Sequence, residues 1–349
     1  MTGKVSKQRW PNGRVELTLE GIKLMKNFID IDSSQTLTVD EYLSSVLQEE
    51  RRNAVAEMLD VGLQLLELMK SNSGVAAPAP EIFVKTTSHV GAEASPFGVI
   101  IITIGMIDHC LDTPWPQPHL VLGMEAPVIL GLNLIAQLGL AWVIGHEFTH
   151  LFRHHHEVEG KLGSSLAVQR ALEHDADLCS TAGIFRLMQR LFGGIIPDIA
   201  IRRYTVFALF WIIRTIPETN NGAGSHPSFS ERFFHITLKL ITLQENRSET
   251  YDPTVNNQLS LDRCNALVSA SIRCEKTYQE INGISDGGYF TEWLEYFENN
   301  NQTEIIWDWV AISPWVEHFS GTAADMRPQL TREEREEALV RGLNLYSEE

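Results

Sequence analysis

The residues that could do chemistry stand closest together in the segment His146-Glu147-Phe148-Thr149-His150. It lies in an apolar run that predicts one long helix, on which the two histidines, four residues apart, share a face. Both imidazoles can then reach one Zn²⁺ at roughly 2 Å. Glu147 lies about 100° round the helix from His146, where its carboxylate can reach a water beside the metal without being a ligand. The segment therefore predicts two zinc ligands and a general base for hydrolysis.

A catalytic zinc ion commonly has a third protein ligand and leaves its fourth position to water. Glu173 follows His150 by 23 residues, and it lies four residues before Asp177 in a second predicted helix. We interpret Glu173 as the third ligand of one Zn²⁺ per chain, and Asp177 as the acceptor for the distal N–H of a ligating histidine. By residue type alone His174 and Asp175 are rival ligands. The alternative for Glu173 and Asp177 is that both lie on a solvated helix face.

Three motifs in a fixed order make the chain resemble a known family. The motifs are H-E-x-x-H, E-x-x-A-D and an H-P-S segment followed by E-R, and they occupy residues 146–150, 173–177 and 225–232. This order resembles the M48 group of gluzincin peptidases. Residues 94–106 are similar to the strand and helix that precede the metal motif in that family, and Arg153-His154 falls where the family often has Arg-His. The H-E-x-x-H motif alone also resembles that of phage-exclusion peptidases of the Lit type.

The resemblance implies a role for each matching residue. Those that would bind zinc are His146, His150 and Glu173, and Glu147 would activate water. His226 and Arg232 match a downstream His and Arg that contact the substrate carbonyl or backbone in the family, where such donors stabilise an oxyanion. The alternatives are that His226 is a turn residue before Pro227 and that Arg232 forms a surface ion pair.

The best-known members of that family carry transmembrane helices, so the apolar segments of this chain need an interpretation. Residues 128–145 form an uncharged run of 18 residues, at the lower limit for a membrane span. The run contains Asn133 and Gln137 and leads directly into the metal motif, which favours the buried centre of a large domain. A second apolar run, residues 204–213, is too short to span a bilayer.

Composition favours a cytoplasmic enzyme. The 349 residues carry a formal net charge of −17, which argues against nucleic acid or an anionic membrane as the main partner. The first 21 residues lack the apolar segment of a secretory signal. None of the four cysteines is spaced as C-x-x-C, so we expect a reducing compartment.

Local signals divide the N-terminal half into elements. Thr38 and Glu41 form a predicted capping box, and we expect one long helix from there to about Lys70. Residues 71–80 resemble a linker, and strands are expected at 81–86 and 97–103. The second strand should lie beside the active-site cleft, where its edge could hold a protein or peptide substrate as an extended strand near 97–103.

Further helices are expected at 127–153, 165–192, 199–216 and 261–281, with one more at 331–345. The run Arg153-His154-His155-His156 suits the end of a helix, and Arg153-His154 could support the zinc ligands. We predict an α+β, mostly helical fold with a zincin-like catalytic core and a small sheet beside the motif helix. The expected regions are an N-terminal helical region (1–75), a catalytic domain (76–245) and a C-terminal helical region (246–349) that packs on the core.

The sequence thus predicts a zinc-dependent endopeptidase. Two alternatives stay open at this point: an inactive regulatory protein that keeps the fold, and a membrane-associated peptidase of the same group. The substrate and the oligomeric state do not follow from the residues.

Overall fold

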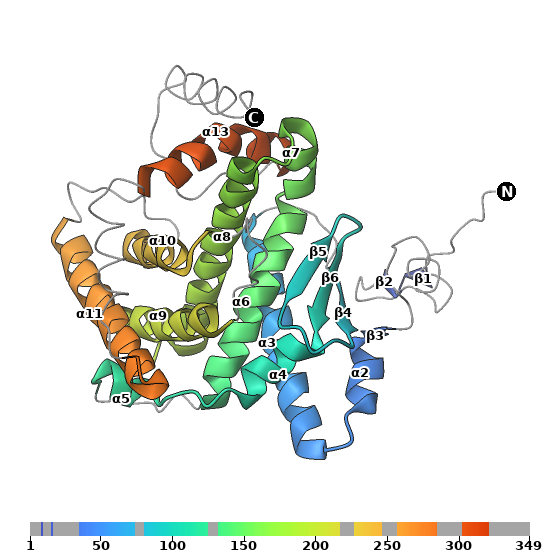
Figure 1. The fold of residues 1–349 in the computed structure, drawn as a ribbon, viewed down its shortest axis with the longest axis horizontal. Coiled ribbons are helices and arrows are strands. Elements are labelled where there is room, and N and C mark those ends of the chain that lie inside the picture. Colours follow the sequence, from blue (N-terminus) through green and yellow to red (C-terminus); the bar gives the residue numbers. More distant parts are fainter. Residues whose placement is uncertain are drawn as a thin grey trace.

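The computed structural model describes residues 8–9, 15–16, 35–73, 80–124, 132–216, 227–245, 257–284 and 302–320. Within them the chain is mostly helical and carries a small mixed sheet, which confirms the α+β prediction (Figure 1). A separate pair of short antiparallel strands, β1 (Gln8–Arg9) and β2 (Val15–Glu16), precedes the rest.

The four-stranded sheet has the order β3-β4-β6-β5, with β3 at Thr36–Thr38, β4 at Glu81–Lys85, β5 at Ala92–Ser95 and β6 at Val99–Thr103. β4 and β6 are parallel, and the two outer strands run antiparallel to them. All five residues of β6 are buried, because a central strand that is covered on both faces requires a continuous apolar run. The strands expected at 81–86 and 97–103 are thereby confirmed.

We expected the strand at residues 97–103 to offer a free edge for a peptide, but β6 is an inner strand of the sheet. β6 is paired with β4 on one side and with β5 on the other, so its backbone groups are already used. Among the described strands, β5 is the outer one on this side, and it packs against the motif helix.

The helical region after β3 differs from the single long helix that we expected. Thr38 and Glu41 do form the capping box, at 3.2 Å and 2.7 Å, and begin α2 (Val39–Ser45). The helix ends at Val46, whose backbone is extended, and α3 (Glu49–Ser73) starts three residues later. A capping box marks where a helix begins, but it carries no information about where that helix ends.

Two long helices at the centre of the molecule position the candidate site. They are α6 (Leu132–Phe152), which contains the H-E-x-x-H motif, and α8 (Leu166–Phe192), which contains Glu173. Ser165 caps α8 by accepting a hydrogen bond from the Val168 N–H. α6 packs against α3, α4, α8 and α9 and against β5 and β6, so it is enclosed on nearly all sides (Figure 1).

The remaining described helices surround this pair. They are α4 (Ile104–Asp112), α5 (Pro118–Leu122), α7 (His155–Leu162), α9 (Asp198–Thr215), α10 (Phe229–Thr242), α11 (Asn257–Asn282) and α13 (Gln302–Ser320). The expected helices at 165–192, 199–216 and 261–281 are confirmed with small shifts of their ends. The helix expected at 127–153 is confirmed as α6 over Leu132–Phe152. Its expected first residues, 127–131, and the helix expected at 331–345 lie outside the described residues.

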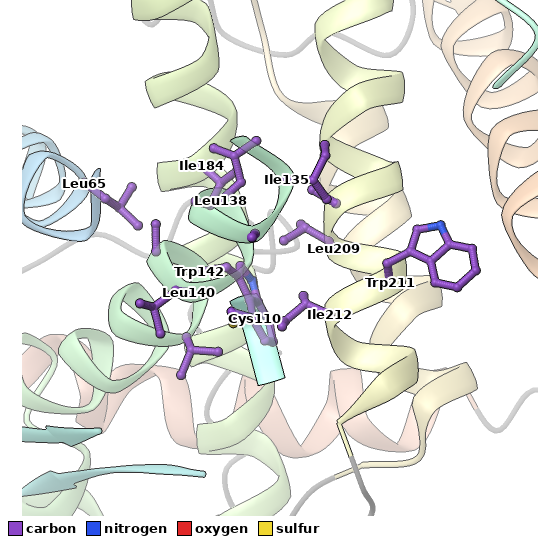
Figure 2. Packing of buried hydrophobic residues seen from close by; sticks show 14 of the residues in the cluster. Leu65, Cys110, Ile135, Leu138, Leu140, Trp142, Ile184, Leu209, Trp211 and Ile212 are labelled. Atoms are coloured by element: carbon purple, nitrogen blue, oxygen red, sulfur yellow. The ribbon is translucent and has the colours of Figure 1, made fainter. Parts of the chain in front are cut away.

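The apolar neighbours of α6 explain why this helix carries so few polar side chains. Figure 2 shows Leu138 and Trp142 of this helix with neighbours from three other helices: Leu65, Ile184, Leu209 and Ile212. Each such side chain contributes roughly 1.5–3 kcal/mol when it is fully buried. Trp211 points away from this group, and its ring lies 5.8 Å from that of Tyr278 on α11 (Figure 2).

None of the helices within the described residues is long and apolar enough to cross a membrane. The buried position of α6 gives a physical reason for the apolar character of residues 132–145.

The main core is continuous across residues 75 and 245, where we expected regional boundaries, since it extends from Tyr42 to Cys274. A second, smaller cluster joins α13 to α7 and α8 through residues such as Trp309, Val158 and Leu172. The division into three regions stays a prediction.

Gly105, in the first turn of α4, offers a test of how tightly the sheet and its helix are joined. A Cβ at this position would lie 2.3 Å from the backbone oxygens of both Ser88 and His89. Backbone cannot move aside as a side-chain end can, so we expect Gly105→Ala to lower the free energy of unfolding by about 1–3 kcal/mol. The matched control is Gly160→Ala on α7, where a Cβ meets nothing within 4 Å and should add up to about 1 kcal/mol. Chemical denaturation of both variants measures these changes in the free energy of unfolding, which should have opposite signs. Equal stability of Gly105→Ala and wild type would contradict the close contact of Gly105 with the backbone of Ser88 and His89.

Candidate metal centre

α6 and α8 bring three potential metal ligands together. His146 Nε2 lies 3.2 Å from His150 Nε2 and 3.0 Å from a carboxylate oxygen of Glu173, and His150 Nε2 lies 3.6 Å from the other oxygen. The ligand atoms all lie within 4.8 Å of one another. Within the described residues this is the only group of three or more His, Cys, Asp or Glu side chains with that property.

These separations match what a small cation requires. Zinc binds nitrogen and carboxylate oxygen at about 2.0–2.2 Å in tetrahedral geometry, so neighbouring ligand atoms should be about 3.3 Å apart. The observed values of 3.0, 3.2 and 3.6 Å bracket that distance. Two imidazoles and one carboxylate are also a donor set that suits Zn²⁺.

Burial differs across the triad and leaves one side accessible. The side chain of His146 is only 6% exposed, whereas Glu173 is 14% and His150 is 19% exposed. Glu147, on the turn between the histidines, is also partly exposed. A catalytic metal needs such an opening for water and substrate, and a fully enclosed structural site does not have one.

Asp177 orients His146, as the helix spacing suggested. Its Oδ1 lies 2.9 Å from His146 Nδ1, on the side of the ring opposite the triad. Arg232 of α10 donates to both oxygens of Asp177, from Nε and Nη2, at 2.8 Å each. Burial alone raises the pKa of Asp177, but the charge and hydrogen bonds of Arg232 and His146 hold it well below its usual range. Asp177 is therefore an ionised acceptor, which holds a proton on Nδ1 of His146 and leaves Nε2 as the nitrogen that gives up its proton when a metal ion binds.

The charges around His146 favour a cation at the triad. Burial lowers the pKa of His146, but hydrogen bonds and charges from Asp177 and Glu173 outweigh burial and raise it to about 10. The surroundings therefore stabilise positive charge at the position where a metal ion would supply it. Metal binding at such a site displaces a proton.

His150 is supported differently, through another histidine. Its Nδ1 lies 3.0 Å from Nδ1 of His155, the first residue of α7, and Nε2 of His155 lies 3.1 Å from Asp175. Arg153 Nε lies 2.5 Å from Asp175, and Trp309 of α13 donates to its other oxygen at 2.9 Å. Burial raises the pKa of Asp175, but the charge of Arg153 and the bonds from His155 and Trp309 hold it well below its usual range.

Sequence reasoning missed most of this second arrangement. It assigned support of the ligands to Arg153-His154, but His154 lies at the surface against Glu157, and His155 makes the contact with His150. His154 adopts a left-handed backbone, with φ 56° and ψ 41°, and this turn brings His155 back toward the motif helix. The histidine run 154–156 was the available signal, but the turn inside it was not evident.

The two rival ligands do not join the triad. Asp175 points to His155 and Arg153. His174 is buried with its ring 4.7 Å from that of His235, and burial lowers its pKa to about 4. Both are buried on sides of α8 other than the one that carries Glu173, because successive residues turn about 100° round a helix.

Two predicted catalytic residues remain to be placed. Burial lowers the pKa of Arg232, but the charge and hydrogen bond of Asp177, followed by the charges of Glu173 and Glu147, raise it above its usual value. Its guanidinium lies 5.5 Å from the centre of the Trp142 ring. Its acidic partner is the buried Asp177, so the surface ion pair that was the alternative for Arg232 is not formed with this residue, and its contact with substrate stays a prediction. His226 lies outside the described residues.

Comparison of the chain with protein-family models, with curated proteins and with solved structures finds no match. The residues and their geometry establish a candidate His/His/Glu metal-binding triad in a helical core.

Proposed function

We propose that this protein is a zinc-dependent endopeptidase. The observation that carries the proposal is the convergence of His146, His150 and Glu173 within 4.8 Å, on the partly exposed side of two buried helices. A general base, Glu147, lies between the two histidines on the same helix. The resemblance of the three motifs to the M48 gluzincins supports the same reaction class.

The triad would hold Zn²⁺, which supplies a Lewis acid for the peptide carbonyl and lowers the pKa of water. Glu147 takes one proton from the attacking water, whose oxygen bonds to the carbonyl carbon. The C–N bond then breaks, and Glu147 passes that proton to the leaving amine. His146 and His150 are held in one tautomer throughout, the first by Asp177 and the second by its contact with His155.

The proposed substrate is a protein or peptide that lies extended along the outer edge of β5 (92–95), since β6 is paired on both sides. Backbone pairing at a sheet edge gives affinity with little dependence on side chains. His226 is proposed to donate to the oxyanion. Arg232 is proposed to act on substrate with the N–H groups other than the two it directs at Asp177.

Elemental analysis of the purified full-length chain tests the metal site. We expect about one zinc per chain in the wild type, and a large loss in His150→Ala and Glu173→Ala, because three protein ligands are the usual complement of a catalytic zinc. His156→Ala is the matched control: this histidine is adjacent but 42% exposed and contacts Glu157.

The same preparations are then given a labelled unstructured protein, and cleavage should follow zinc content. Wild-type protein that takes up no zinc from excess metal would contradict the proposal. Retention of zinc in Glu173→Ala together with its loss in Asp177→Ala would show that Asp177 is the ligand.

A further inference from the structure

The two histidines of the triad are oriented by acids from the same stretch of α8, but by different routes. His146 contacts Asp177 directly, at 2.9 Å. His150 reaches Asp175 only through His155, with 3.0 Å and 3.1 Å for the two contacts. The first arrangement follows from the helix spacing, whereas the second depends on a residue from another helix and calls for an account of its own.

The hydrogen positions in the second route follow from the donor inventory. Asp175 is an acceptor, because it is paired with Arg153 and also receives the indole N–H of Trp309. His155 Nε2 must therefore carry the proton that faces Asp175. A neutral His155 then has its lone pair on Nδ1, and it accepts the Nδ1–H of His150. This leaves the lone pair of His150 on Nε2, the atom that faces the triad.

The opposite arrangement would block the site. If Nδ1 of His155 carried the proton, Nδ1 of His150 would have to accept it, and a neutral His150 would hold its own proton on Nε2. That proton would occupy the ligand position. The chain Asp175–His155–His150 thus selects one of two tautomers, and the selected one can bind a metal.

We call the hydrogen-bonded series Asp175–His155–His150 the relay. Its surroundings are buried, and Trp309, from a distant part of the sequence, contacts Asp175. His155, Asp175 and Arg153 are each 2% exposed, and Trp309 is 3% exposed. Trp309 belongs to α13, 134 residues after Asp175, and packs in the cluster that joins α13 to α7 and α8. Figure 1 shows α13 lying across the ends of α7 and α8.

We propose that His155, Asp175 and Trp309 are positioning residues that fix the metal-binding tautomer of His150, so that helix α13 is part of the metal site. This inference rests on the proposed metal triad, and it does not require that the protein be a peptidase. It assigns a role in metal binding to the region 246–349, in which none of the sequence-predicted site residues lies.

Zinc affinity, measured in the full-length protein by competition with a chromogenic chelator, tests the relay. We expect His155→Phe, which keeps a ring but removes both nitrogens, to bind Zn²⁺ about 10–100-fold more weakly than wild type. His155→Gln should recover much of this loss, since its amide can accept from His150 and donate to Asp175 at once. A residue with a purely structural role would not show rescue by an amide that fills the space less well than phenylalanine.

The anchor is tested by Trp309→Phe, which removes the N–H and keeps most of the packing. We expect a smaller loss of affinity, up to about 10-fold, with Trp307→Phe as the control because Trp307 lies on the same helix and is 48% exposed. The visible spectrum of the Co²⁺-loaded protein should change in His155→Phe and Trp309→Phe and remain as in wild type in Trp307→Phe. Thermal unfolding of the metal-free variants shows which of them are folded. If His155→Phe does not fold, the comparison of Trp309→Phe with Trp307→Phe decides the matter, and equal zinc affinity of these two variants overturns the proposal.

The outcomes separate the two proposals. A folded His155→Phe with unchanged zinc affinity and unchanged Co²⁺ spectrum overturns the relay alone, and so does a folded His155→Gln that binds Zn²⁺ no more tightly than a folded His155→Phe. A wild-type protein that binds neither Zn²⁺ nor Co²⁺ overturns both the relay and the metallopeptidase. Metal binding that depends on His155 in a protein that cleaves no substrate supports the relay and removes only the peptidase.

Discussion

Glu147→Gln is expected to reduce the rate of peptide hydrolysis by about 10²–10⁴-fold and to leave the zinc content unchanged. Glutamine has nearly the size of glutamate but cannot take a proton from water at neutral pH. The triad that would hold the metal consists of three other residues, so its geometry should survive the substitution. Initial rates on a labelled unstructured protein, measured beside elemental analysis of the same samples, check both halves of the expectation.

The control for this variant is Glu67→Gln on the exposed face of α3, which makes the same chemical change away from the site. It should match wild type in rate and in zinc content. Wild-type rates in Glu147→Gln would remove this residue from the mechanism. Loss of zinc in Glu147→Gln would instead mean that the carboxylate is a ligand, contrary to its position about 100° from His146 on the helix.

Local signals in the sequence were sufficient for the elements that carry the triad. Two histidines four residues apart on an apolar helix could be recognised, and so could a glutamate four residues before an aspartate on a second helix. Such i,i+4 spacing is a property of a few neighbouring residues. The same kind of signal identified Asp177 as a partner for a histidine. The sequence also predicted the β6 strand correctly. The strands beside it could not be predicted, because the pairing of strands depends on segments that are distant in the sequence.

The parts of the site that could not be predicted depend on the path of the chain between elements. His155 contacts His150 only because the backbone turns through a left-handed conformation at His154, which is uncommon for a residue other than glycine. Trp309 reaches Asp175 only because α13 packs on α8. Neither event leaves a periodic or motif-like trace in the sequence, since each is selected by packing among helices.

The pair of Asp177 and Arg232 gives a second large effect, in which stability and metal binding can be separated. Both carboxylate oxygens of Asp177 accept hydrogen bonds from Arg232. The side chain of Asp177 is 3% exposed and that of Arg232 is 17% exposed. Asp177→Ala leaves a largely buried guanidinium unpaired, so we expect the free energy of unfolding to fall by about 3 kcal/mol. The variant should also bind zinc about 10–100-fold more weakly, because His146 loses the acceptor that fixes its ring and tautomer.

The double variant Asp177→Ala/Arg232→Met distinguishes the two causes. Methionine removes the unpaired charge and fills part of the space, so stability should recover toward the wild-type value. Zinc affinity should stay low, because no carboxylate faces Nδ1 of His146 in either variant. Chemical denaturation of the metal-free proteins measures the first quantity and chelator competition the second. If zinc affinity recovers together with stability, then Asp177 acts on the metal site only by holding the fold together, and the orienting role that its 2.9 Å contact with His146 indicates would have to be abandoned.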